Sequence, residues 1–194
     1  MQFIHIPKNA GTSIQKAINM PSVGHLTIRQ ITHPESAHPA KHDDFFACVR
    51  NPYDRACSLF YFSKYNLKEV HAKRKLPKSV LIPEDDNITM TEFWQLMLEK
   101  QTESKILKQQ VDFLKDNNEK ISNQVVHILR YENLASEWPG FAKQHGFNEL
   151  SHENKSYRPH NKWRWQDEIN QTIIDIVNEI YADDFEHFGY ERLK

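Results

Sequence analysis

A short run of residues near the start of the chain combines the groups that bind a phosphate. It contains a lysine, small residues that leave backbone N–H groups accessible, and two hydroxyls: Lys8, Asn9, Ala10, Gly11, Thr12 and Ser13. The apolar run before it predicts a strand, and Ile14, Ala17 and Ile18 have the spacing of a helix. A turn between a strand and a helix N-terminus presents N–H groups and the positive end of the helix dipole to an anion. We therefore predict an anion-binding loop at residues 8–13.

This loop differs from the phosphate loop of nucleotide kinases and ATPases, G-x-x-x-x-G-K-[ST]. When Gly11 is aligned with the second glycine of that motif, Thr12 takes the lysine position and Ile6 replaces the first glycine. The chain also has no apolar strand that ends in an aspartate suited to hold magnesium. Both departures disfavour a Mg²⁺-dependent kinase or ATPase, which stays open as an alternative. A simpler alternative is a turn in which Lys8 is only solvated.

A second candidate anion site follows the apolar run 45–49. Arg50 stands at the end of this run, where its guanidinium could hold a phosphate through two N–H donors. Pro52 suits the first turn of a helix, and Ser58 lies about two turns into that helix, where it could donate to the same anion. Arg55 could instead stabilise the surface of the helix or pair in the neighbourhood of Asp54. Taken alone, Arg50 is equally consistent with a structural ion pair.

Together the two segments resemble the binding elements for 3′-phosphoadenosine 5′-phosphosulfate (PAPS) in the sulfotransferase superfamily. Residues 7–13 match a P-K-x-x-x-T-S loop, and residues 50–58 match an R-x-P-x-x-R-x-x-S segment. The likeness is closest to the carbohydrate sulfotransferase branch, which has FVRNPWDRLVSLY-like stretches. Residues 128–134 (ILRYENL) and the tail at 180–190 are similar to later signatures of that family, while about 60 residues between match weakly.

The resemblance implies transfer of a sulfuryl group from PAPS to an acceptor hydroxyl, with 3′,5′-ADP as the second product and no metal. Lys8, Thr12 and Ser13 would then hold the 5′-phosphosulfate. Arg50 and Ser58 would hold the 3′-phosphate, which distinguishes PAPS from ATP. By analogy with the carbohydrate branch, we expect the acceptor to be a glycan hydroxyl or another small molecule.

Sulfuryl transfer needs a base for the acceptor hydroxyl and a cation near the departing oxygen. Lys8 is the expected cation. The family resemblance implies His25 as the base, because residues 24–30 (GHLTIRQ) match an HxTxRE-like segment. His5, inside the predicted strand, is expected to be a packed core residue.

Three other histidines compete with His25 for the role of base: His33, His38 and His42. Pro34 and Pro39 make their segment irregular. Their spacings of five and four residues do not fit a regular zinc finger, and no cysteine joins them. We therefore expect no metal site.

Two basic stretches could act on substrates. Residues 64–78 contain six Lys or Arg against one acid, and either line an acceptor cleft or form a solvated loop. Residues 155–164 contain no acid and three aromatic rings, counting a histidine. By the resemblance, Arg158, Lys162 and Arg164 would close over the PAPS. Aromatic rings amid basic residues also suit a nucleic-acid strand, but one short patch is thin support for that reading.

The composition is that of an ordinary globular protein. The chain has 194 residues, of which 39% are hydrophobic, and 25 basic residues balance 26 acidic ones, so we expect no nucleic-acid or membrane partner. No apolar run approaches the roughly 20 residues that span a bilayer. Lys8 and Asn9 interrupt the N-terminal apolar stretch, so we expect no signal peptide and a cytoplasmic location. Cys48 and Cys57 are expected to be reduced packing residues.

The order of the elements predicts an α/β fold. Apolar strands are expected at 3–6, 45–49 and 124–129, and helices at 13–20, 53–62, from 91, 104–115, from 136 to 146, and 169–180. We expect one domain over residues 1–194, with a mainly parallel central sheet flanked by helices, as in the P-loop kinase-like scaffold of sulfotransferases. Residues 24–44 and 64–88 are expected to be irregular, the latter as a possible acceptor-side insertion. A non-catalytic anion- or glycan-binding protein on the same scaffold is a further alternative.

Overall fold

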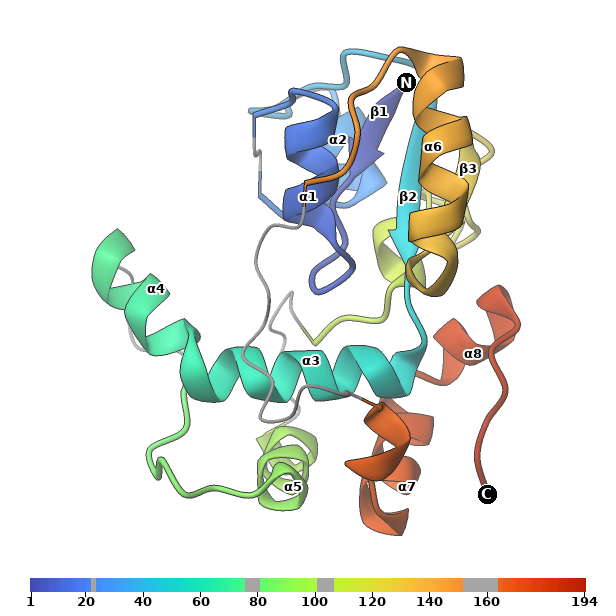
Figure 1. Cartoon of the computed structure of the whole chain (residues 1–194). Coiled ribbons are helices and arrows are strands. Elements are labelled where there is room, and N and C mark those ends of the chain that lie inside the picture. Colours follow the sequence, from blue (N-terminus) through green and yellow to red (C-terminus); the bar gives the residue numbers. More distant parts are fainter. Residues whose placement is uncertain (22–23, 76–80, 101–106, 152–163) are drawn as a thin grey trace. The chain divides into compact units, whose positions relative to one another are not determined.

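The computed structural model (Figure 1) describes residues 1–21, 24–75, 81–100, 107–151 and 164–194. The chain forms two compact units. The first, here called the sheet unit, comprises residues 1–51 and 108–154, and the second, the helical unit, comprises residues 52–107 and 155–194. These units subdivide the segment that the sequence predicts as one domain.

Three parallel strands form the sheet unit's centre. They are β1 (Gln2–Ile4), β2 (Phe45–Val49) and β3 (Val125–Arg130), with β2 in the middle. Every residue of β2 is buried, as expected for a continuous apolar run in a strand covered on both faces. Because the strands are parallel, their carboxyl ends lie at one edge of the sheet, here called the carboxyl edge. The predicted phosphate loop starts at this edge after β1, and Arg50 lies at the same edge directly after β2.

Two helices pack on one face of this sheet, α1 (Gly11–Ala17) and α6 (Leu134–His145) (Figure 1). Their apolar side chains share one core cluster with strand residues: Phe3, Ile14, Ala17, Phe46, Cys48, Leu129, Leu134, Trp138, Phe141 and Ala142. Helix α6 ends at Gly146, which has φ 70°, a left-handed conformation that glycine adopts without steric cost. The C-cap predicted from the sequence is therefore confirmed.

A short helix, α2 (Ile28–Thr32), lies in the stretch that the sequence predicts as irregular. It begins with a capping box, in which the Thr27 side chain accepts from the N–H of Gln30 and the Gln30 side chain accepts from the N–H of Thr27. These two bonds satisfy N–H groups that a helix start leaves unpaired, which stabilises even five helical residues.

The helical unit contains five described α-helices: α3 (Pro52–Tyr65), α4 (Leu67–Arg74), α5 (Met90–Lys100), α7 (Gln171–Ile180) and α8 (Ala182–Phe188). Helix α3 packs against α5 and α7 (Figure 1). The core of the helical unit includes the buried residues Tyr53, Phe60, Trp94 and Val177. Phe185 of the predicted tail signature also belongs to this core.

Two further expectations about the elements were wrong. Within the described part of 104–115 only a 3₁₀ turn forms, Val111–Phe113. The chain turns back there, since Ser122 N–H donates to the Leu114 carbonyl at 2.9 Å. Part of the predicted irregular stretch 64–88 is helical, because it contains the end of α3 and all of α4.

The cap of α5 also differs from the expected one. The sequence suggests Thr91 as N-cap, but the helix begins at Met90, and Thr89 exchanges hydrogen bonds with Glu92. The predicted strands each lie within two residues of the observed ones. The structure therefore bears out a mixed α/β chain with a small parallel sheet.

Candidate functional site

The loop between β1 and α1 has an unusual backbone. Lys8 has φ 71° and Ala10 has φ 59°, so two residues with side chains occupy the left-handed region. Such a conformation costs of order 1–3 kcal/mol per residue and occurs often at functional sites, where surrounding contacts maintain it. Helix α1 begins at the next residue, Gly11. The loop that the sequence identifies is thus a bent connection held in place by other contacts.

One of those contacts is the side chain of Asn9, which is fully buried. Its Nδ2 donates to the Cys48 carbonyl of β2 at 2.9 Å and to Oε1 of Gln110 at 2.6 Å. The centre of the loop is therefore fastened to the middle strand of the sheet. Asn9 acts here through its side chain, whereas the sequence suggested only a place in an anion-binding loop.

Gln110 joins this loop to the residue that follows β2. Its Oε1 accepts from the Arg50 N–H at 2.9 Å, and its Nε2 donates to the Arg50 carbonyl at 2.8 Å. The side chain has no exposed surface, and it holds the Arg50 backbone while also accepting from Asn9. Sequence analysis missed Gln110, because a single glutamine in a predicted helix carries no signal of such a role.

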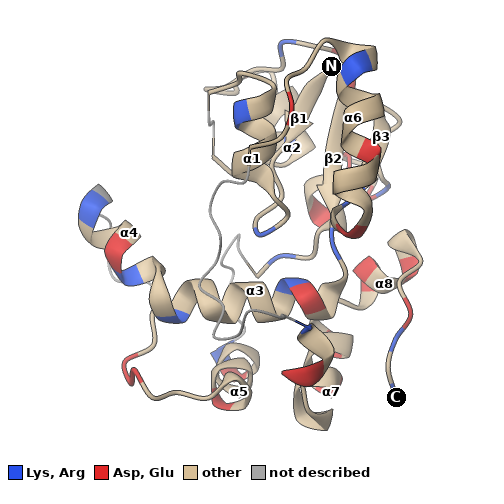
Figure 2. Ribbon diagram, in the orientation of Figure 1, with Lys and Arg blue, Asp and Glu red and all other residues tan. Residues whose placement is uncertain are grey.

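The Arg50 side chain reaches the predicted phosphate loop. Its Nη1 donates to the Lys8 carbonyl at 3.0 Å, and its guanidinium carbon lies 4.0 Å from the centre of the Tyr131 ring. An arginine over an aromatic face gains a cation–π attraction that also fixes the plane of the guanidinium. Figure 2 shows the basic segments in the loop after β1 and at the end of β2. The two candidate anion segments therefore meet at the carboxyl edge.

The turn after β3 also contacts this edge. Glu132 Oε1 accepts from the Asn51 N–H at 2.6 Å. Tyr131 and Glu132 belong to the RYENL segment, so this part of the family resemblance lies beside Arg50 in space. All three strands thus contribute residues to one cluster: the loop after β1, Arg50 and Asn51 after β2, and the turn after β3.

His25 lies against the start of the same loop. Its Nδ1 is 3.1 Å from the His5 carbonyl, and the two imidazole rings meet edge to face with centroids 4.4 Å apart. A carbonyl can only accept, so Nδ1 carries the proton that His25 donates. In the neutral ring the lone pair is then on Nε2, which is the form that a general base requires.

His5 is a packed histidine, as the sequence suggested. Burial, and after it the nearby His25, lower its pKa to about 3, although a hydrogen bond with Gln15 acts in the opposite direction. The His5 ring lies so close to Gly11 that a Cβ at that position would overlap it. Glycine is therefore required at position 11 by close packing, and not by a special backbone angle.

The remaining predicted residues belong to segments of the helical unit. Ser58 is 6% exposed and belongs to α3 of the helical unit. Arg55 is buried, with its guanidinium carbon 5.1 Å from the Tyr181 ring, so the expectation of a helix-surface residue was wrong. Arg164 is exposed and approaches Asp167 at 4.0 Å. Arg158 and Lys162 lie outside the described residues.

Three of the described basic residues in the stretch 64–78 have local partners. Lys64 Nζ donates to the Ile88 carbonyl at 2.9 Å. Lys68 pairs with Asp86 at 2.9 Å and Lys73 pairs with Glu69 at 2.6 Å. These exposed pairs match the solvated alternative more closely than a concentrated positive patch.

Other expectations concern metals, thiols and membranes. In the described parts of the chain, no group of three or more His, Cys, Asp or Glu side chains could hold a metal ion. Cys48 and Cys57 are both buried and free, and burial raises the pKa of the Cys48 thiol, so that thiol serves packing. Among the described helices none has the length and apolar character needed to cross a membrane.

Comparison with known proteins gives one match. A sequence model described as the sulfotransferase family matches residues 1–191. No curated protein and no solved structure matched the chain. The family match covers nearly the whole sequence, including the loop at 8–13, the segment at 50–58, the RYENL turn and most of the tail. The chain therefore belongs to the sulfotransferase family.

Proposed function

We propose that this protein transfers a sulfuryl group from PAPS to an acceptor hydroxyl and binds the donor at the carboxyl edge of the sheet unit. Membership of the sulfotransferase family supports sulfuryl transfer in general. The observation that carries the donor assignment is the contact between the Arg50 guanidinium and the Lys8 carbonyl, at 3.0 Å. It brings two segments that are 42 positions apart into one place, and each has the groups that bind a phosphate.

The edge has the charge that a nucleotide with several phosphates needs. The chain as a whole carries a formal charge of −1, so attraction to PAPS must come from local groups. Lys8 and Arg50 supply two cations, while the α1 N-terminus, Thr12 and Ser13 supply donors. We propose that these groups hold the 5′-phosphosulfate and the 3′-phosphate. Further proposed contacts, which the family resemblance implies, are Ser58, Arg158, Lys162 and Arg164.

The proposed reaction is a direct in-line transfer. The acceptor hydroxyl oxygen forms a bond to sulfur, while the bond from sulfur to the bridging oxygen breaks and its electron pair stays on the 5′-phosphate of 3′,5′-ADP. Nε2 of His25 takes the hydroxyl proton. Lys8 stabilises the charge that develops on the departing oxygen, and no metal is needed for this step.

His25 is suited to act as this base for two reasons. The bond from its Nδ1 to the His5 carbonyl selects the tautomer with the lone pair on Nε2. The low pKa of His5 keeps the neighbouring ring neutral, so His5 does not repel the proton that His25 receives. We propose a glycan hydroxyl as the acceptor, by analogy with the carbohydrate branch.

Ligand selectivity provides the first test. Isothermal titration calorimetry with 3′,5′-ADP and with 5′-ADP, each with and without Mg²⁺, should show tighter binding of 3′,5′-ADP and no requirement for Mg²⁺. Equal binding of both nucleotides, or binding only with Mg²⁺, would favour a kinase or ATPase and contradict the proposal.

Product analysis provides the second test. Incubation of the protein with PAPS and a panel of glycans should give a product that is heavier by one sulfuryl group in mass spectrometry. Tight binding of 3′,5′-ADP with no sulfated product from any acceptor would favour a non-catalytic binding protein.

A further inference from the structure

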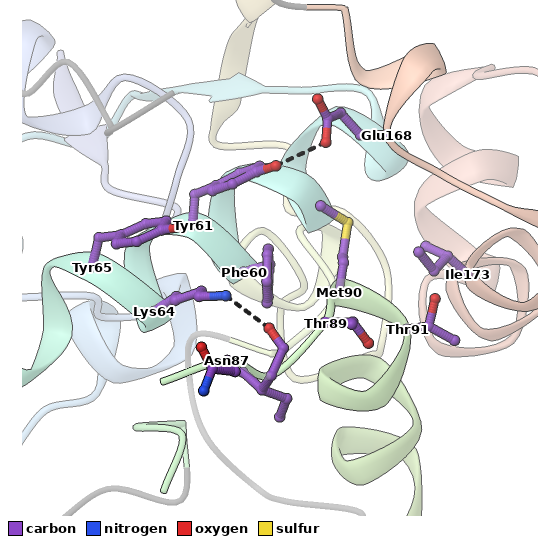
Figure 3. Close-up of a pocket in the computed structure, with 11 residues that line it drawn as sticks. Phe60, Tyr61, Lys64, Tyr65, Asn87, Thr89, Met90, Thr91, Glu168 and Ile173 are labelled. Carbon is purple, nitrogen blue, oxygen red and sulfur yellow. Dashed lines mark hydrogen bonds between the residues drawn. The ribbon is translucent and has the colours of Figure 1, made fainter. Parts of the chain in front are cut away.

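The helical unit contains a cavity of about 370 Å³ beside the C-terminal part of α3 (Figure 3). Its lining comes from α3, from the segment 87–91 at the start of α5, and from residues 168 and 173. Cavities of roughly 300–1,000 Å³ are the usual size for small-molecule sites. None of these residues belongs to the proposed donor site.

One wall of the cavity is aromatic. Tyr61 and Tyr65 are one helical turn apart, and their rings are almost parallel, with an interplanar angle of 8° and centroids 6.1 Å apart. Tyr65 is 44% exposed. In the described part of the chain, Tyr65 and Val126 are the two large hydrophobic residues that are exposed. Figure 3 shows both rings on the same side of the cavity. Such a wall suits a ligand with a flat apolar face.

The remaining lining combines apolar side chains, Phe60, Ile88, Met90 and Ile173, with polar side chains of both charges. Glu168 Oε2 accepts from the Tyr61 hydroxyl at 2.8 Å, and Lys64 Nζ donates to the Ile88 carbonyl at 2.9 Å. Burial and the neighbouring Glu168 raise the pKa of Tyr61, so this hydroxyl stays protonated and remains a donor. A carboxylate accepts several hydrogen bonds and an ammonium donates three, so both groups can also serve a ligand. Asn87 and Thr91 add neutral polar groups.

These features define the class of ligand. A pyranose ring has one apolar C–H face and a rim of hydroxyls, which matches an aromatic wall opposite polar side chains. Among the described residues that line the cavity there is one cation and one carboxylate, so this lining has no excess of positive charge to select a polyanion. Two basic residues of α4, Lys68 and Lys73, are paired with Asp86 and Glu69.

We propose that this cavity binds one neutral sugar residue, with its apolar face on the Tyr65 ring and hydroxyls on Glu168 and Lys64. The identification of that sugar as part of the acceptor rests on the proposed function. The sugar-binding property itself rests only on the cavity.

The test is ligand-observed saturation-transfer NMR on the full chain without nucleotide. The probes are methyl β-D-galactopyranoside, methyl N-acetyl-β-D-glucosaminide and, as a charged comparison, methyl β-D-glucuronide. At least one neutral glycoside should receive saturation, strongest at the C–H protons of one face, and more than the glucuronide receives. Replacement Tyr65→Ala should weaken binding about fivefold or more, while Tyr65→Phe, which keeps the ring, should bind like the unmodified protein.

A second variant tests the polar side of the cavity. Glu168→Gln should weaken binding by about tenfold, because a charged acceptor is replaced by a neutral one. The matched control is Glu179→Gln, on the exposed side of α7, which should bind normally. Thermal unfolding of each variant checks that Tyr65→Ala and Glu168→Gln remain folded.

The outcomes separate this inference from the proposed function. Absence of saturation for all three glycosides, preference for the glucuronide, or unchanged binding by folded Tyr65→Ala would overturn the sugar site. Sugar binding that needs Tyr65, in a protein that fails to bind 3′,5′-ADP, would support the site and contradict the sulfotransfer proposal. Failure of the sugar tests with normal 3′,5′-ADP binding would leave the proposed function standing and remove this cavity from it.

Discussion

The carboxyl edge of the sheet unit and the cavity of the helical unit are built in different ways. At the edge, buried side chains bond to backbone atoms: Asn9 to the Cys48 carbonyl, Gln110 to both backbone groups of Arg50, and Arg50 to the Lys8 carbonyl. In the cavity, an exposed ring and a tyrosine–glutamate pair form the walls. A backbone-bound cluster holds its geometry closely, whereas a wall of side chains can be altered one residue at a time.

This difference leads to an expectation about mutations. Changes to the buried groups that form these hydrogen bonds should affect donor binding and stability together. Changes to side chains that act directly on the substrates should affect catalysis or donor binding with little effect on stability. Changes in the cavity should affect only the binding of the proposed sugar. Four predictions test the first half of this comparison, ordered from the largest effect to the smallest.

The largest effect is expected for His25→Ala. The variant should lose about 10²–10⁴ in kcat, because general base catalysis is removed. Binding of 3′,5′-ADP should change little, since the proposed role concerns the acceptor proton. Turnover with a sulfated-product assay and calorimetry with 3′,5′-ADP measure the two quantities.

The control for this variant is His38→Ala, an exposed histidine in the same long connection. A near-normal kcat in His25→Ala would show that the base is another residue. A loss of equal size in His38→Ala would point to that residue instead.

Lys8→Ala should lower kcat by about 10²–10³, the usual effect of removing one group that stabilises transition-state charge. It should also weaken 3′,5′-ADP binding, because the loop loses its cation, while the loop backbone stays bound through Asn9. Lys16→Ala, on the exposed side of α1, is the matched control. If both variants have the same kcat, Lys8 has no part in the reaction.

Gln110→Leu is the sharpest test of the backbone-bound cluster. It leaves the Arg50 N–H and carbonyl and the Asn9 amide without the partner they have now, and each buried unsatisfied group costs about 1–3 kcal/mol. We expect a fall of several kcal/mol in unfolding free energy, measured by urea denaturation, together with weaker 3′,5′-ADP binding.

Gln144→Leu, on the exposed surface of α6, provides the comparison. Gln110→Glu keeps the size of the side chain but loses the donor to the Arg50 carbonyl, and should have an intermediate effect. A Gln110→Leu protein that is less stable but binds 3′,5′-ADP normally would assign Gln110 to the fold alone.

The smallest effect concerns the pH dependence of stability. The pKa of folded His5 is about 3, below its unfolded value near 6.5, so the unfolded chain takes up a proton that the folded chain excludes. The contribution of neutral, buried His5 to the unfolding free energy is complete above pH 6.5. It is lost as pH falls toward 3, at up to about 1.4 kcal/mol per pH unit. Urea unfolding at pH 7, 6 and 5 measures this slope.

His5→Phe keeps a ring next to Gly11 but removes the titrating group, so its unfolding free energy should fall less steeply between pH 6.5 and 5. His38→Asn, at an exposed position, should retain the original slope. An identical pH dependence in His5→Phe and the unmodified protein would mean that folding does not change the pKa of His5.

Sequence analysis located the elements with strong local signals. The run FFACV predicted β2 with its observed bounds, and Gly146 predicted the end of α6. Both signals are contained in a few neighbouring residues. The helix expected at 104–115 is absent from the described part of that range, where only a 3₁₀ turn forms. The chain turns back after Leu114, whose carbonyl accepts from the Ser122 N–H, and helical periodicity in a sequence does not predict such a turn.

For the candidate site as well, sequence analysis found only the residues that carry a signal in the sequence itself. Lys8 and Arg50 could be chosen from residue type and spacing, and His25 from the family resemblance. Gln110 and Tyr131 could not, because their roles depend on contacts with residues 60 to 101 positions away or on a ring that reaches Arg50 only in the folded chain.

The amino-acid sequence alone specified the family, the strands and the two segments with phosphate-binding chemistry, since each depends on residues close together in the chain. The tertiary structure decided which of these segments touch, how a buried glutamine joins them, and which nitrogen of His25 bears its proton. These properties come from parallel strands that place distant residues at one edge, and pairing between distant strands leaves no local pattern in the sequence.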